Sequence, residues 1–192
     1  MSFMLLGILN SQAAADAGGP AYEVLSTVTL TGTTTAIIFD DLDLITDYKH
    51  FQLRCSVRNS LGASGATAMR LKFNEITSGY NSHRLYAQGG SGVYQSDNFS
   101  AGDIHFGMVP YANTSLNAWG VSIVDIPDYQ STDKFQSIKA FSGLSADLGN
   151  ENRVEIANGS LQSSVAINQI RIQTDNGSMV SGSTISLIGI RG

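Results

Sequence analysis

The sequence of 192 residues has one cysteine, three prolines and few charged side chains. Because Cys55 is alone, no internal disulfide can form, and a zinc site built on several cysteines is excluded. Charged residues make up 14% of the chain, and its eleven basic residues are scattered under a net charge of −5. This pattern is unlike the basic footprint of proteins that bind phosphate backbones, so we expect no nucleic-acid partner. No cofactor is predicted either.

A segment long enough to span a membrane is also missing. The apolar run at residues 3–9 has seven residues, whereas roughly 20 are needed to cross a bilayer. Three alanines at residues 13–15 make the run imitate a secretory signal peptide, but no Lys or Arg precedes it. We therefore expect the run to be retained and predict no membrane contact.

The main pattern that the chain does have is an alternation with a period of two. Between residues 50 and 58, Phe51, Leu53, Cys55 and Val57 alternate with polar side chains, as in a strand with one buried and one solvated face. Cys55 is then a small buried apolar side chain. Similar segments predict strands at 22–30, 34–39, 50–58, 69–73, 82–87, 103–109, 118–126, 135–141, 153–157, 167–173 and 184–190.

Short strands separated by polar turns, without a long helical pattern after residue 20, predict an all-β fold. We expect an antiparallel β-sandwich of the jelly-roll kind. Two hairpins are predicted within it. Strands 50–58 and 69–73 are expected to pair with each other, and Asn176-Gly177 is expected to be the turn of a second hairpin.

Catalytic motifs do not stand out in the sequence. The three histidines, His50, His83 and His105, lie on different predicted strands and have no carboxylate at motif spacing. We interpret each as a surface or hydrogen-bonded side chain. A serine hydrolase with a G-x-S-x-G elbow would need a strand, turn and helix that the pattern lacks. The chain is therefore expected not to be an enzyme, and a polysaccharide hydrolase with two carboxylates across a cleft remains a third hypothesis.

The carboxylates Asp40, Asp41 and Asp43 offer oxygen ligands of the kind that Ca²⁺ prefers. Their spacing lacks the glycine and the terminal glutamate of an EF-hand loop. We interpret them as a solvated strand end and predict no metal site.

Aromatic side chains in or beside predicted loops offer rings that can stack on sugars. Trp119 is different, because it alternates with Val121 and Ile123, and we predict that these three side chains point into the core. The possible ligand-binding residues are Tyr80, Tyr94 and Tyr111.

The run at residues 3–9 is the segment whose chemistry demands a partner. As a helix it would be apolar nearly all round, and nine residues make a marginal helix in water. Burial gains on the order of 9 to 18 kcal/mol, while ordering the backbone costs roughly 1 to 2 kcal/mol per residue. These terms nearly cancel for one copy, so docking favours a rigid groove or several arms together, which indicates an oligomer. The alternative is a tail folded back on its own domain. The predicted partner-binding residues are Phe3, Met4, Leu5, Leu6, Ile8 and Leu9.

The opening sequence, MSFMLLGILNSQAA, resembles the start of many tailed-bacteriophage proteins, especially those of cyanophages. The segments YKHFQLR at residues 48–54 and LIGIRG at residues 187–192 are similar to phage structural proteins of uncharacterised role. The resemblance implies a shared docking peptide that fixes variable modules to the virion, and it carries no catalytic residues.

The main expectation is therefore a non-enzymatic structural protein located in a phage virion. Its exterior β-sandwich domain, residues 21–192, would be tethered by an extended or short helical arm and linker at residues 1–20. It would act as a head decoration or cement subunit, or as a tail-appendage or tail-fibre component, and bind other capsid or tail proteins as a homotrimer. The second hypothesis is a carbohydrate- or receptor-binding module of the virion, in which the tyrosines contact host glycans.

Overall fold

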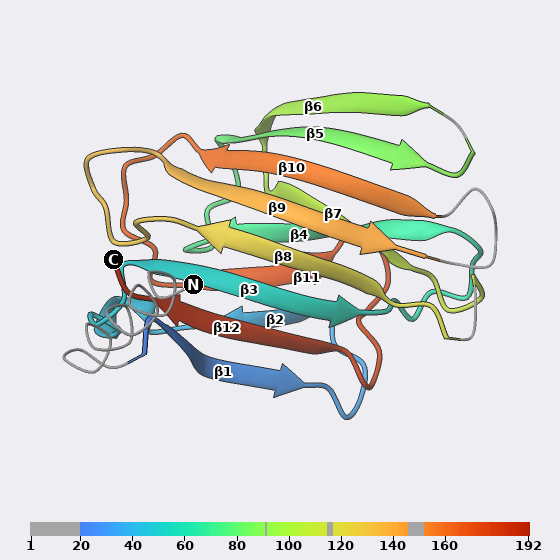
Figure 1. Ribbon diagram of the computed structural model, residues 1–192, viewed down its shortest axis with the longest axis horizontal. Coiled ribbons are helices and arrows are strands. Elements are labelled where there is room, and N and C mark those ends of the chain that lie inside the picture. The colour runs from blue at the N-terminus through green and yellow to red at the C-terminus, as the bar shows by residue number, and fades with distance from the viewer. Residues whose placement is uncertain (1–19, 91, 115–116, 146–151) are drawn as a thin grey trace, which may run out of the picture.

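Two antiparallel sheets lie face to face in the computed structural model, which describes residues 20–90, 92–114, 117–145 and 152–192 (Figure 1). The strands in these ranges are β1 (Tyr22–Thr29), β2 (Ala36–Phe39), β3 (His50–Val57), β4 (Ala66–Phe73), β5 (Tyr80–Gln88), β6 (Val93–Ala101), β7 (Ile104–Pro110), β8 (Gly120–Ile126), β9 (Gln136–Leu144), β10 (Arg153–Leu161), β11 (Ile170–Thr174) and β12 (Thr184–Ile190), with a 3-10 turn, η1 (Leu42–Leu44), after β2. The eight-stranded sheet has the order β1-β12-β3-β8-β9-β10-β5-β6, and the four-stranded sheet has the order β2-β11-β4-β7.

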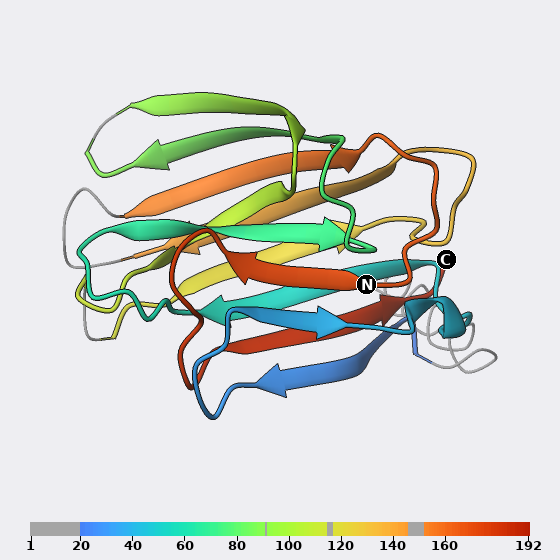
Figure 2. The same ribbon diagram turned by 180° about the vertical axis from the view of Figure 1, so that it is seen from behind.

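The eight-stranded sheet faces the viewer in Figure 1, and Figure 2 shows the four-stranded sheet that covers its back. The predicted fold class, an all-β antiparallel sandwich, is confirmed. Each predicted strand segment overlaps a strand of the structure, and β6 was not predicted because its side chains are mostly exposed and lack apolar alternation. In the described ranges, no helix is long and apolar enough to cross a membrane.

Both predicted hairpins are wrong. β3 pairs with β12 and β8 in the larger sheet, whereas β4 pairs with β11 and β7 in the smaller one. Asn176-Gly177 connects β11 and β12, which also lie in different sheets. These connections cross between the sheets because each strand buries its apolar face against the same core from an opposite side. The turn at Gly177 instead closes over the buried Asn59, whose side chain donates a hydrogen bond to the Asn176 carbonyl at 2.6 Å.

The core fills the space between the two sheets. As predicted, Phe51, Leu53, Cys55 and Val57 of β3 all point into it. Desolvation in this core raises the pKa of the Cys55 thiol to about 12, so the thiol stays protonated at neutral pH.

Glycines let β7 approach the larger sheet very closely. A Cβ atom added at Gly120 of β8 would lie 2.8 Å from Cγ1 of Val109, and one added at Gly107 of β7 would lie 2.6 Å from the Ser122 hydroxyl oxygen. Gly159 of β10 faces β7 in the same way. The backbone of β7 therefore fills space that side chains of β8, β9 and β10 would otherwise occupy.

This close approach reverses the predicted alternation of β8. Gly120 and Ser122 are buried beneath β7, whereas Val121 and Ile123 point away from the core and are 53% and 42% exposed. Trp119, which was predicted to be a core residue in register with them, is only half-buried. The prediction was wrong because the narrow gap admits small side chains, so the larger apolar ones take the outer face.

Candidate functional site

The outer face of the eight-stranded sheet carries two rows of apolar side chains across β8, β9, β10 and β5. In the first row, neighbouring strands place Ile123 beside Phe141, Phe141 beside Ile156, and Ile156 beside Leu85. The second row joins Val121 to Val93 of β6 through three further strands. We call these side chains the outer apolar face; its large members are Leu85, Val93, Val121, Ile123, Phe141, Val154 and Ile156.

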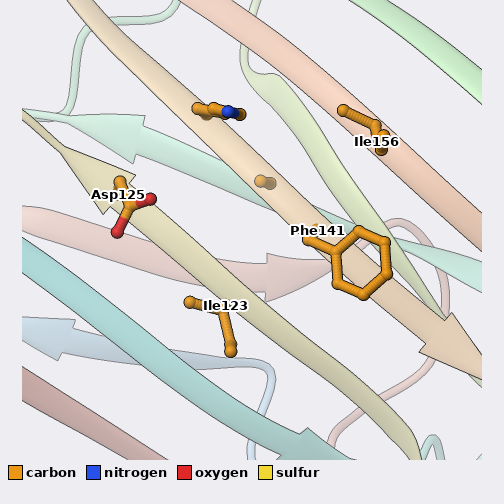
Figure 3. A pocket seen from close by; sticks show the side chains of 6 residues that line it. Ile123, Asp125, Phe141 and Ile156 are labelled. Carbon is orange, nitrogen blue, oxygen red and sulfur yellow. The ribbon is translucent and has the colours of Figure 1, made fainter. Parts of the chain in front are cut away.

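The seven large side chains of the outer apolar face are between 42% and 69% exposed. Together they leave roughly 500 Å² of apolar surface open, because each is about half exposed and six of the seven are aliphatic side chains, which are smaller than the roughly 150 to 250 Å² of an aromatic one. This lies in the upper part of the roughly 300–600 Å² found for the largest patch on a typical monomer. Figure 3 shows its centre, a shallow hollow where Phe141 lies between Ile123 and Ile156.

A polar row borders the outer apolar face on one side. It crosses the sheet through directly paired residues, and hydrogen bonds tie its first members together. Gln52 donates to Asp125 at 2.8 Å, and Arg54 donates to Gln52 at 3.1 Å. At the other end, the His83 Nδ1 atom lies 2.6 Å from a carboxylate oxygen of Asp97. The full row is Gln52, Asp125, Lys139, Asn158, His83 and Asp97. The apolar rows thus have a polar rim, as protein interfaces do.

A second candidate site lies on the opposite face of the same sheet, where β5 and β6 extend beyond the smaller sheet (Figure 1). The rings of Tyr86 and Tyr94 stack with centroids 5.4 Å apart. The Arg153 guanidinium lies 3.7 Å from the centroid of the Tyr86 ring, and that of Arg84 lies 5.1 Å from it. Tyr94 is 44% exposed, so its ring is open to a ligand.

A buried carboxylate, Glu155, holds these arginines from below. Its oxygens lie 3.2 Å from Arg153 and 3.8 Å from Arg84, and they also contact the His105 ring. Burial on its own would raise the pKa of Glu155, but the hydrogen bond and charge of His105, together with the two arginines, outweigh it and lower the pKa. Burial lowers the pKa of His105. The ionised carboxylate therefore fixes the two guanidiniums against Tyr86.

The structure separates the three tyrosines that were predicted to bind a ligand. Tyr80 is fully buried, and its hydroxyl exchanges hydrogen bonds with the backbone of Phe73, so the prediction for Tyr80 is wrong. Tyr94 lies at the far end of the β5–β6 pair from Tyr80. Tyr111 is half-buried and follows β7, which belongs to the other sheet. Only Tyr94 of the three combines exposure with an aromatic neighbour.

Some of the histidines and acidic residues that drew attention in the sequence have local partners. The Asp128 amide donates to His50 at 2.9 Å, and Asp40 accepts a hydrogen bond from Gln169. Asp41 adopts positive φ at the start of η1. In the part of the chain that the structure describes, no three His, Cys, Asp or Glu side chains are grouped so that they could hold a metal ion.

Sequence reasoning missed the outer apolar face, although the sequence contains a signal for it. In part of each of β8, β9 and β10, a small inward residue stands next to a large apolar outward one: Ser122 beside Ile123, Ser142 beside Phe141 and Ala157 beside Ile156. Such a contrast over consecutive strands indicates a close backbone approach on the small side. The predicted partner-binding residues Phe3, Met4, Leu5, Leu6, Ile8 and Leu9 lie outside the described residues.

No protein-family model matches the chain, and no curated protein matches it. Among solved structures, it is similar to exo-inulinase from Aspergillus awamori, with 13% identity and a TM-score of 0.42 over 88% of this chain and 30% of that chain. It is also similar to the CBM2 module of an evolved Dit from Lactobacillus casei BL23 phage J-1, with 10% identity and a TM-score of 0.26 over 82% of this chain and 69% of that one. This chain thus spans less than a third of the inulinase chain. At identities this low the likeness concerns the fold alone.

Proposed function

We propose that this protein is a non-enzymatic structural component of a phage virion, which works by adhesion to other virion proteins. Residues 1–20 would tether the domain, and the β-sandwich would stand on the exterior of the head or tail. The observation that carries the proposal is the outer apolar face, because it offers a large apolar surface with a polar rim. A surface of this composition favours contact with another protein.

The chemistry of the outer apolar face favours a protein over a sugar. Its rows consist of aliphatic side chains and one aromatic ring, Phe141. A sugar needs hydrogen-bond partners for its hydroxyl groups, and the apolar rows present none from their side chains, since Asp125 and Lys139 line the hollow from the polar row at one edge. Apolar protein side chains, by contrast, can be buried there without leaving polar groups unpaired.

The proposal predicts that the chain joins particles through residues 1–20. Virions that lack the protein would be mixed with the whole chain or with a chain that lacks these residues, and the bound fraction measured by co-sedimentation. Circular dichroism would establish that the shortened chain keeps its β-structure. We expect the whole chain to bind and the shortened, folded chain to lose binding.

A matched control keeps all residues and replaces Leu5 by Lys in one variant and Gln12 by Lys in another. Both add the same charge to the arm, but only the first places it among the apolar residues 3–9. Loss of binding for Leu5→Lys alone would support the tether. Binding that survives both the deletion and Leu5→Lys would contradict it.

A second candidate function is carbohydrate or receptor binding at the overhang of β5 and β6. The observation that favours it is the exposed ring of Tyr94, stacked on Tyr86 and backed by Arg84 and Arg153. Two guanidiniums share one carboxylate there, so the cluster has an excess positive charge. Such a site would suit a glycan that carries a carboxylate group.

A further inference from the structure

We infer that the outer apolar face binds a second copy of this chain, face to face about a two-fold axis. The inference rests on the proposed function, since it names the first protein that this adhesive surface meets. In such a pair the eight-stranded sheets of two copies would lie back to back, and the four-stranded sheets would be outermost. Aligned packing of two sheets at about 10 Å has ample precedent in β-sandwiches.

The area of the face suits a stable pair. A standard interface buries about 800 Å² on each partner. The seven large side chains supply roughly 500 Å² of apolar surface, and the polar row beside them adds to it. The apolar rows and the polar row together therefore approach the area of a standard interface.

The charges of the face also suit self-association. The whole chain has a net charge of −5, which would make two random surfaces repel each other. On this face, however, Arg54 and Lys139 balance Asp125 and Asp97. Two copies can thus approach through this face without a like-charge penalty, and basic side chains of one copy can meet acidic ones of the other.

A two-fold pair fits better than a ring, because a ring joins two different surfaces of each subunit. The remaining exposed large hydrophobic side chains in the described ranges number at most two in any one strand, Tyr22 and Val24 in β1 and Tyr94 and Phe99 in β6, so they form no set that matches the face. They are Tyr22, Val24, Ile38, Leu44, Leu61, Tyr94, Phe99 and Phe135. The surface that matches the outer apolar face in size and chemistry is the same face on another copy. This departs from the homotrimer expected from the sequence.

The test compares two phenylalanines with nearly equal exposure. Phe141, at the centre of the face, is 56% exposed, and Phe135, just before β9, is 54% exposed. The two residues are six positions apart, which corresponds to roughly 20 Å along an extended chain, and Phe135 lies beyond the polar row. Phe141→Lys and Phe135→Lys would each be made in the whole chain, and self-association measured by sedimentation equilibrium over a concentration series.

We expect the unaltered chain to form a two-copy species. Phe141→Lys should raise the dissociation constant of the pair at least about tenfold, and Phe135→Lys should leave it unchanged. A chain that stays single at every concentration, forms three-copy species, or responds equally to both changes would overturn the inference. A single chain that still binds virions would overturn the pairing and leave the proposed function standing.

A second measurement covers the case in which Phe141→Lys does not fold. Val154→Cys places a thiol on the face, and Ile38→Cys places one on the outer side of the smaller sheet, at exposures of 54% and 40%. The native Cys55 is buried and does not compete for a thiol reagent. Labelling at position 154 should slow as protein concentration rises, while labelling at position 38 should not. Equal rates at all concentrations would overturn the inference.

Discussion

Replacing Gly120 by Ala tests the close approach of β7 that shapes the outer apolar face. The added Cβ atom would lie 2.8 Å from Cγ1 and 2.9 Å from Cα of Val109, and it would also overlap the Met108 carbonyl oxygen. Two of these atoms are backbone, so β7 itself would have to move. Gly143 of β9 is the matched control, because it faces outward and a Cβ there would have its nearest neighbour at 3.9 Å.

The expected magnitudes follow from these distances. Overpacking a core costs typically 1 to 3 kcal/mol, so we take about 2 kcal/mol as the packing cost of Gly120→Ala. Alanine has less conformational freedom than glycine in the unfolded chain, and this stabilises both variants by about 0.4 to 1 kcal/mol. Gly120→Ala should therefore lower the free energy of unfolding by about 1 to 2 kcal/mol, whereas Gly143→Ala should raise it by up to about 1 kcal/mol.

Urea denaturation followed by circular dichroism would measure both variants at one protein concentration. For a chain of this size, 1 kcal/mol corresponds to roughly 2 to 4 °C in Tm, so thermal scans should separate the two variants by several degrees. Equal stability of Gly120→Ala and Gly143→Ala would refute the reasoning. It would mean that β7 yields freely and does not force the large side chains outward.

Two further predictions concern the cluster beneath the overhang. The pKa of His105 is lowered from 6.5 and that of Glu155 from 4.5, so the unfolded chain binds more protons than the folded one below each of these values. The free energy of unfolding should be highest above about pH 6.5 and fall on acidification, first as His105 becomes protonated and then, below about pH 4.5, as Glu155 does. Tm values that stay level or rise from neutral to acid pH would contradict this. If the overhang binds an acidic glycan, Tyr94→Ala should weaken binding at least about tenfold, while Tyr111→Ala should not. Calorimetric titration would measure both variants, and a Tyr94→Ala variant that binds as well as the unaltered chain would rule out this role of the overhang.

The sequence predicts much of the fold because its strands mostly obey local rules. In β3, polar side chains alternate with Phe51, Leu53 and Val57. In the structure these apolar side chains are buried and the polar ones are partly or fully exposed, as expected. Each strand needs only one apolar face for this inference to succeed. Strand pairing is different, since it depends on which sheet a strand joins, and β3 and β4 look alike in sequence although they lie in opposite sheets.

The candidate sites were harder to predict because they arise from long-range packing. The orientation of Val121 and Ile123 depends on β7, which approaches through Gly107 and Gly120. Apolar alternation alone does not reveal which face is buried when the facing strand comes this close. Glu155 was likewise not singled out, because its partners Arg84 and His105 come from β5 and β7.

The glycine-lined gap beneath β7 has a consequence for how this protein can change over evolutionary time. Because Gly120, Ser122 and Gly159 fill the inner side, the outward residues of the same strands contribute little to the core. Substitutions at positions such as Ile123 or Phe141 can therefore alter the choice of binding partner at little cost to folding. The sandwich would then tolerate rapid divergence of its adhesive side while its interior stays constant.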